Sequence, residues 1–284
     1  MASLLSRHRV RKYSNTLYVV LASFAFLIAL APLASILYET FLKGFAALSV
    51  DFFTKVTPPI GGTGGGILNA IEGSFVMVGI ASLIGVPVGV LAGAYLTEYP
   101  GKFAYYARLL AEVLTGVPSI VTGIFVYLLL VATLHRFSAL AGGVALAFMM
   151  IPIVAISTNE SLKLVSSSIR EGSLALGISR AKTLLYVLLS TAKSGVVTGI
   201  ALSVARVMGE TAPLLFTALG SQNLMTSIND PALSMTIMIY NFGTSPYANA
   251  HTFAWGAALV LLLIVLSLNV TVRLASRSRI AGAE

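Results

Sequence analysis

The sequence predicts an all-α, polytopic membrane protein with six transmembrane helices. Hydrophobic residues make up 57% of the 284 residues, charged residues make up only 10%, and the mean hydropathy is +0.92. A soluble domain of this size could not bury so much apolar surface. Six apolar stretches come near the length of about 20 residues that crosses a bilayer core. They lie at residues 17–37, 73–96, 109–134, 139–156, 196–219 and 253–272.

The N-terminal region combines a basic segment with the first apolar stretch. Residues 1–16 are basic and are predicted to be cytoplasmic, and residues 17–38 are predicted to form the first transmembrane helix. A cleavable signal peptide is the alternative, but its apolar region is only about 7–15 residues long. Residues 39–69 form a predicted extracytoplasmic, glycine-rich loop. This loop lacks the Lys-Ser/Thr pair that ends a phosphate-binding P-loop.

Residues 70–274 are predicted to form a core with the remaining five helices. Four glycines of the second helix have spacings that let another helix backbone approach closely in lipid. They are Gly79, Gly85, Gly89 and Gly93. Pro118 predicts a bent third helix, and Pro213 predicts a loosened fifth helix. Residues 230–241 are too short to cross the bilayer and are predicted to form a re-entrant or interfacial segment.

The distribution of Lys and Arg predicts that both termini are cytoplasmic. With this orientation, most basic residues fall on the inner side, in the termini and in loop 158–193. The outer side holds only Lys43, Lys55 and Arg136. The formal net charge of +8 is therefore dispersed over helix ends, which excludes a nucleic-acid-binding surface. We expect a multi-pass protein of the cytoplasmic (inner) membrane with a cytoplasmic tail at 275–284.

Loop 158–193 is the longest polar interval of the core. Apolar residues in its first half recur at helical spacing and predict an amphipathic helix. They are Leu162, Val165 and Ile169. Gly177 can adopt the left-handed conformation that ends such a helix, and Ser179 can cap a second one. The pattern predicts a helix-turn-helix that docks in a groove of a soluble partner, with a solvated connecting loop as the alternative.

Arg206 lies near the middle of the fifth apolar stretch, where an arginine costs about 2.5–3.5 kcal/mol to insert. Glu210 follows one helical turn later and is predicted to pair with it, while Ser203 and Thr211 add hydroxyl groups nearby. We interpret Arg206 as a group that faces a water-filled pathway and binds an anion there. A structural ion pair that fixes the helix register is the alternative.

One motif resembles permease subunits of type I ABC importers, and two further runs resemble the PstA family of phosphate permeases. Glu171-Gly172-Ser173 followed by Gly177 resembles the Glu-Ala-Ala-x-x-x-Gly loop of these permeases, with small residues in place of the alanines. The run ARVMGETAPLLFTA at 205–218 and the run LTGVPSIV at 114–121 are similar to the PstA family. The resemblance implies a MetI-like fold and a subunit of an ATP-driven phosphate importer.

The resemblance also implies the partners. An ATPase subunit, which would be present in two copies and would use ATP-Mg, would contact the loop that carries Glu171, Gly172, Ser173 and Gly177. The other expected partners are a sister permease of the PstC type, an extracytoplasmic phosphate-binding protein, phosphate and membrane lipid. This chain is expected to be no enzyme and to bind no cofactor or metal, because its sequence has no nucleotide-binding motif and its histidines lack ligand spacing.

Two other kinds of transporter remain open at this stage. One is a permease for another oxyanion, such as sulfate or molybdate. The other is an ion-coupled secondary transporter, which would show an inverted repeat and intramembrane acidic residues in both halves.

Overall fold

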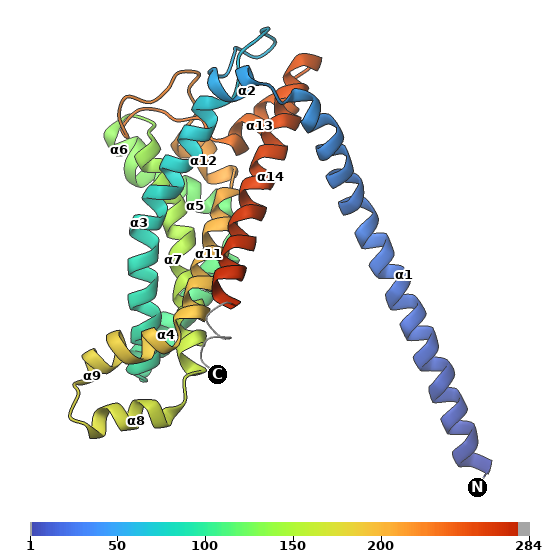
Figure 1. Ribbon diagram of the computed structural model, residues 1–284, viewed down its shortest axis with the longest axis vertical. Coiled ribbons are helices and arrows are strands. Elements are labelled where there is room, and N and C mark those ends of the chain that lie inside the picture. The colour runs from blue at the N-terminus through green and yellow to red at the C-terminus, as the bar shows by residue number, and fades with distance from the viewer. Residues whose placement is uncertain (1, 278–284) are drawn as a thin grey trace.

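The computed structural model describes residues 2–277, with side chains for residue 11 and residues 14–274. Every regular element in this part of the chain is a helix (Figure 1). Four helices are long and apolar enough to cross a membrane. They are α1 (Ala2–Ala47), α3 (Leu68–Glu98), α7 (Ala139–Lys163) and α14 (Ala248–Arg277). The count reaches six when each of two bent helix pairs is taken as one crossing. Of the expected tail at 275–284, residues 278–284 lie outside the described residues.

The first bent pair joins α4 (Lys102–Gly116) to the segment Ser119–Leu134 at an angle of 104°. That segment contains α5 (Ser119–Val126), the π-helix η1 (Tyr127–Val131) and α6 (Ala132–Leu134). Pro118 lies at the break and Val117 has an extended backbone, as expected for a residue that precedes proline. The chain therefore changes direction between two separate helices and does not form the single bent helix that the sequence predicts.

The second bent pair joins Arg180–Thr191 to α11 (Lys193–Met208) at an angle of 76°. Arg180–Thr191 contains α9 (Arg180–Lys182), the π-helix η2 (Thr183–Leu188) and α10 (Leu189–Thr191). A separate short helix, α12 (Ala212–Thr217), follows α11. The fifth apolar stretch is thus divided between two helices.

Helices α3 and α7 form the closest contact of the core. A Cβ atom added to Gly93 would lie 2.3 Å from the carbonyl oxygen of Ala155, and one added to Gly85 or Gly89 would lie 3.0 or 2.7 Å from Cβ of Met150 or Val154 in α7. Gly79 has no such neighbour within 4 Å. Three of the four glycines expected at a helix contact therefore lie at one, because a side chain there would push the two backbones apart.

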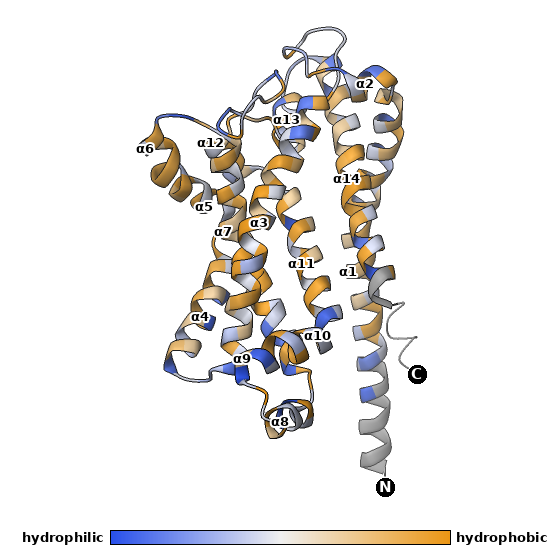
Figure 2. Cartoon of the chain, turned by 60° about the vertical axis from the view of Figure 1, so that its left-hand side comes forward, coloured by the Kyte–Doolittle hydropathy of each residue, from blue (hydrophilic) through white to orange (hydrophobic). Residues whose placement is uncertain are grey.

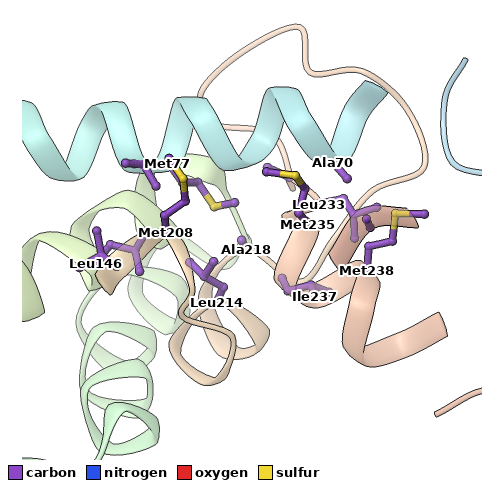
Figure 3. Close-up of a cluster of buried hydrophobic side chains, with 14 of the residues drawn as sticks. Ala70, Met77, Leu146, Met208, Leu214, Ala218, Leu233, Met235, Ile237 and Met238 are labelled. Atoms are coloured by element: carbon purple, nitrogen blue, oxygen red, sulfur yellow. The ribbon is translucent and has the colours of Figure 1, made fainter. Parts of the chain in front are cut away.

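Residues 230–241 contribute a buried helix, α13 (Met235–Gly243). Met235, Ile237 and Met238 are completely buried. Figure 3 shows them in one apolar cluster with side chains such as Met77 of α3 and Leu214 of α12. This segment is inserted among the membrane helices and does not lie flat on their surface.

Helix α1 diverges from the bundle and meets it only near its C-terminal end (Figure 1). There a Cβ atom on Gly44 would lie 2.6 Å from Cβ of Leu259 in α14. The helix continues to Ala47, beyond the predicted end at residue 38, because Glu39 and Lys43 form an ion pair along the helix and do not interrupt it. The predicted loop 39–69 therefore includes helical turns, among them α2 (Val50–Thr54).

Residues 164–191, which we call the knob, project from one end of the bundle (Figure 1). They contain α8 (Ser167–Ala175), α9, η2 and α10, and hydrophilic residues are concentrated on α8 and α9 (Figure 2). The sequence pattern placed Leu162 and Ile169 on one helix, and this is wrong. Helix α7 runs on to Lys163, and α8 begins only after Ser166, whose side chain accepts a hydrogen bond from the Ser168 backbone.

Candidate functional site

Helix α11 presents one face that no other part of the described chain covers. Thr198, Leu202 and Arg206 are exposed on this face, one helical turn apart. An adjacent face packs on α7, where Gly199 approaches Ser157 so closely that a Cβ atom would lie 2.4 Å from the serine Cβ. Arg206 therefore lies on the outside of this subunit, in the last turn of an apolar helix. Contact with lipid would be costly there, so a protein or aqueous neighbour is required.

The helix ends at Met208, two residues after Arg206. The backbone N–H of Gly209 donates to the Arg206 carbonyl at 3.1 Å, and the N–H of Glu210 donates to the Val207 carbonyl at 3.2 Å. These tight turns close α11. Helix α12 then starts at Ala212 with Pro213 in its first turn, where proline's missing N–H leaves no internal hydrogen bond unmade. Residues 209–211 form a break between the two helices.

This break overturns the expected pairing of Arg206 with Glu210. The prediction assumed one continuous helix in which the two residues share a face, but the helix stops between them. Within residues 14–274, no ion pair joins the two side chains. Glu210 is half-buried at the break together with Thr211. Ser203 lies on the buried face, where its hydroxyl donates to the Ile200 carbonyl at 2.7 Å, so it does not share the exposed face of Arg206.

The two prolines predicted to bend helices belong to elements that touch. Helix α5, which begins directly after Pro118, packs against the first turn of α12. A Cβ atom on Gly123 would lie 2.6 Å from Cα of Pro213. The break in the first bent pair and the break beyond α11 are thus coupled through a backbone contact that tolerates no side chain.

The knob is folded around a left-handed glycine and a buried hydrogen bond. Gly177 has a φ of +76°, and its N–H donates to the Leu174 carbonyl at 3.0 Å. The hydroxyl groups of Ser173 and Thr183 lie 2.9 Å apart and are both buried. Gly172 and Glu171 are exposed, and Gly172 has open space around it. The motif residues thus divide into two that build the corner, Ser173 and Gly177, and two that face outward.

Two ion-pair sets at this end of the bundle are absent from the sequence predictions. Arg170 of α8 pairs with Glu98, a buried carboxylate at the end of α3, at 3.4 Å. Arg108 of α4 pairs with both Glu112 and Glu160, each at 2.9 Å, and so links α4 to α7. An acidic residue at the end of an apolar stretch, opposite a basic loop, is the signal in the sequence that points to the first pair. The second pairs Glu112 with Arg108, one turn earlier on the same helix.

Within residues 2–277, no group of three His, Cys, Asp or Glu side chains comes close enough to hold a metal ion.

Comparisons with known proteins agree with this architecture. Residues 85–280 match the family described as "Binding-protein-dependent transport system inner membrane component". The phosphate transport system permease protein PstA of Haemophilus influenzae is 44% identical over 93% of this chain and 94% of its own length. The probable PstA of Methanocaldococcus jannaschii is 37% identical over 95% of this chain and 96% of its own.

Solved structures share the fold. A chain of a bacterial alginate ABC transporter superposes with a TM-score of 0.65 at 11% identity, covering 94% of this chain and 96% of that one. A chain of the inward-facing MetNI methionine ABC transporter gives a TM-score of 0.59 at 19% identity, covering 74% and 92%. With a family match over most of its length and full-length relatives at these identities, the chain belongs to the binding-protein-dependent transport system inner membrane components, as a permease of the PstA type.

Proposed function

We propose that this chain is the transmembrane permease subunit of an ATP-driven importer of inorganic phosphate and forms half of the translocation pathway. The observation that carries the proposal is the exposed position of Arg206, on a face of α11 that the rest of the described chain leaves uncovered. An arginine at this depth requires an aqueous or protein neighbour. A pathway between this subunit and a sister permease of the PstC type supplies both.

The chemistry of Arg206 suits a phosphate ion. Its planar guanidinium can donate two parallel hydrogen bonds to phosphate oxygens, and it remains charged at any physiological pH. Glu210 is held at the neighbouring break without an ion pair to Arg206. In this proposal its negative charge weakens the retention of phosphate, since transport requires release as well as binding.

The knob is the docking element for the ATPase subunits. In the orientation favoured by the basic residues, the knob and both termini are cytoplasmic, where ATP is available. The exposed Glu171 is placed to meet a basic group of the ATPase, and two ATPase copies bind and hydrolyse ATP-Mg. An extracytoplasmic phosphate-binding protein delivers the anion to the opposite end of the bundle.

Movement of the knob has two routes into the membrane helices. One is the Arg170–Glu98 ion pair to α3, and the other is the continuous path through η2 and α10 into α11. Closure of the ATPase pair therefore shifts α11, which carries Arg206, and the pathway alternates between outward and inward access.

An uptake assay tests the substrate. The complex of both permeases, the ATPase and the binding protein is reconstituted in liposomes, and ATP-dependent uptake of phosphate, sulfate and molybdate is measured in parallel. We expect uptake of phosphate alone. Uptake of sulfate or molybdate in preference to phosphate would assign the same machinery to another oxyanion, and uptake without ATP would overturn the proposed energy source.

A further inference from the structure

The carbonyl of Glu210 receives its hydrogen bond from a side chain of a different helix. In a continuous helix it would accept from the N–H of Leu214, but that N–H donates to the Thr211 carbonyl at 3.1 Å. Pro213 has no N–H to offer. The hydroxyl of Thr236, in the first turn of α13, donates to this carbonyl instead, at 2.8 Å.

Thr236 is itself held in place by its neighbours. Its hydroxyl lies 2.8 Å from the hydroxyl of Ser234, and both side chains are buried. A threonine hydroxyl has one proton, which is committed to Glu210, so Ser234 must donate to Thr236. Ser234 in turn accepts the N–H of Ile237 at 3.1 Å and caps α13. The result is a series of hydrogen bonds, each donating to the next, that runs from Ile237 through Ser234 and Thr236 to Glu210.

The residues at the start of this hydrogen-bond series are fixed to the core. The N–H of Met235 donates to the hydroxyl of Ser74 in α3 at 2.8 Å. The side chains of Met235 and Ile237 are completely buried in the apolar cluster (Figure 3). The start of α13 is therefore a fixed support, while residues 209–211 form the irregular segment that it holds.

We propose that Thr236 is a positioning residue, which fixes the break between α11 and α12 so that Arg206 and Glu210 are presented correctly to the passing anion. The inference rests on the proposed function of Arg206. In a membrane, a free carbonyl at a helix break needs a hydrogen-bond donor. Without this donor the break relaxes toward another arrangement, and both side chains move with it.

Valine and serine at position 236 separate the hydroxyl from the shape of the side chain. Thr236→Val keeps the size and removes the donor, whereas Thr236→Ser keeps the donor. Thr217→Val is the matched control, because Thr217 is also buried but its hydroxyl donates to the Pro213 carbonyl within its own helix, at 2.8 Å. Each variant is purified as the complete transporter complex.

Uptake of phosphate is measured against the concentration of loaded binding protein. We expect Thr236→Val to assemble normally and to lose about tenfold or more in maximal rate, with an unchanged half-saturating concentration, because a misplaced group slows translocation without altering delivery. Thr236→Ser and Thr217→Val should keep wild-type rates. A wild-type rate for Thr236→Val, or an equal loss for Thr217→Val, overturns the proposal. If neither Thr236→Val nor Thr236→Ala assembles, Thr236 is a folding residue and the proposal is wrong.

A second readout does not depend on transport. The chain has no cysteine, and Gly209 is exposed, with only the Arg206 carbonyl, at 3.6 Å, near an added Cβ. In a Gly209→Cys background, we expect Thr236→Val to change the rate of thiol modification of this subunit and Thr217→Val to leave it unchanged. An unchanged rate for Thr236→Val contradicts the positioning role. Thr236→Val could change the rate of thiol modification while Arg206→Gln takes up phosphate normally. This result would support the positioning role of Thr236 and contradict the proposed anion site at Arg206.

Discussion

The hydroxyl groups of Ser173 and Thr183 form a buried hydrogen bond of 2.9 Å across the corner of the knob. Ser173 lies near the end of α8, and Thr183 begins η2 on the return path to the membrane. The bond joins the outward and returning halves of the element that we propose to bind the ATPase. A force applied to α8 can therefore reach η2 directly, without passing around the turn.

Removal of one hydroxyl should weaken this corner more than removal of both. Thr183→Val leaves the Ser173 hydroxyl buried and unpaired, which costs about 1–3 kcal/mol. The Ser173→Ala/Thr183→Val double variant should recover part of this loss. Hydrogen exchange of the knob amides measures the local opening free energy. Additive effects of the two substitutions would show that the bond contributes nothing to the corner.

Gly177→Val should uncouple ATP hydrolysis from transport. A β-branched residue at a φ of +76° is strained by about 1–2 kcal/mol or more, so the corner opens or rotates. We expect the complex to hydrolyse ATP with little phosphate uptake. Gly172→Ala is the control, since an added Cβ meets nothing within 4 Å and alanine favours the helix. Coupled turnover at the wild-type ratio in Gly177→Val would contradict the role of the corner.

The ion pair between Arg170 and Glu98 predicts an asymmetric pair of variants. Glu98 is 7% exposed, so Arg170→Gln leaves a carboxylate buried without its partner. The thermal stability of the purified complex should fall more in Arg170→Gln than in the Arg170→Gln/Glu98→Gln double variant. Equal stabilities of the single and double variants would mean that solvent screens the two charges, as it does for exposed ion pairs.

Much of the helical framework is predictable from hydropathy because lipid imposes a length and an apolar composition on every crossing helix. The small-residue contacts of α3 follow from the same logic, since Gly85, Gly89 and Gly93 recur at helical spacing and do meet α7. Local conformation is predictable where one residue type is required. Gly177 has the left-handed conformation expected from its position after a helix.

The arrangement of the candidate site is not predictable in this way. Arg206 and Glu210 have the spacing of an ion pair, but the tight turns at Gly209 end the helix between them. The Thr236 hydroxyl that supports the break lies 26 positions further along the chain. Periodicity describes the faces of a regular helix, so it carries no information on where a helix ends or which distant group compensates for the end.

The loop at residues 226–230 should become less ordered in acid. The Asp230 carboxylate accepts hydrogen bonds from the Thr226 hydroxyl and from the N–H groups of Ser227 and Thr226, and these hold the pKa of Asp230 below its usual value. A lowered pKa in the folded state means that the stabilisation is present above the ordinary aspartate pKa of about 4 and is lost as the pH falls through the folded pKa.

Helix α7 reports this transition, because its Ala139 and Leu140 N–H groups donate to the carbonyls of Asp230 and Ile228 at 2.9 and 2.8 Å. We expect hydrogen-exchange protection of these two amides to fall below about pH 4, the range in which aspartate is protonated. In Asp230→Asn, the protection should be lower throughout and independent of pH over this range. The same acid loss in Asp230→Asn would assign the transition to another group.

Phosphate uptake by the Arg206→Gln variant tests the proposed pathway most directly. The shorter, neutral side chain keeps a polar end but loses the positive charge and the bidentate geometry of arginine. We predict that the complex still co-purifies with its partners, keeps its ATPase activity and no longer takes up phosphate. Normal uptake in an assembled complex, or loss of assembly itself, would show that Arg206 is a structural residue and that the anion passes elsewhere.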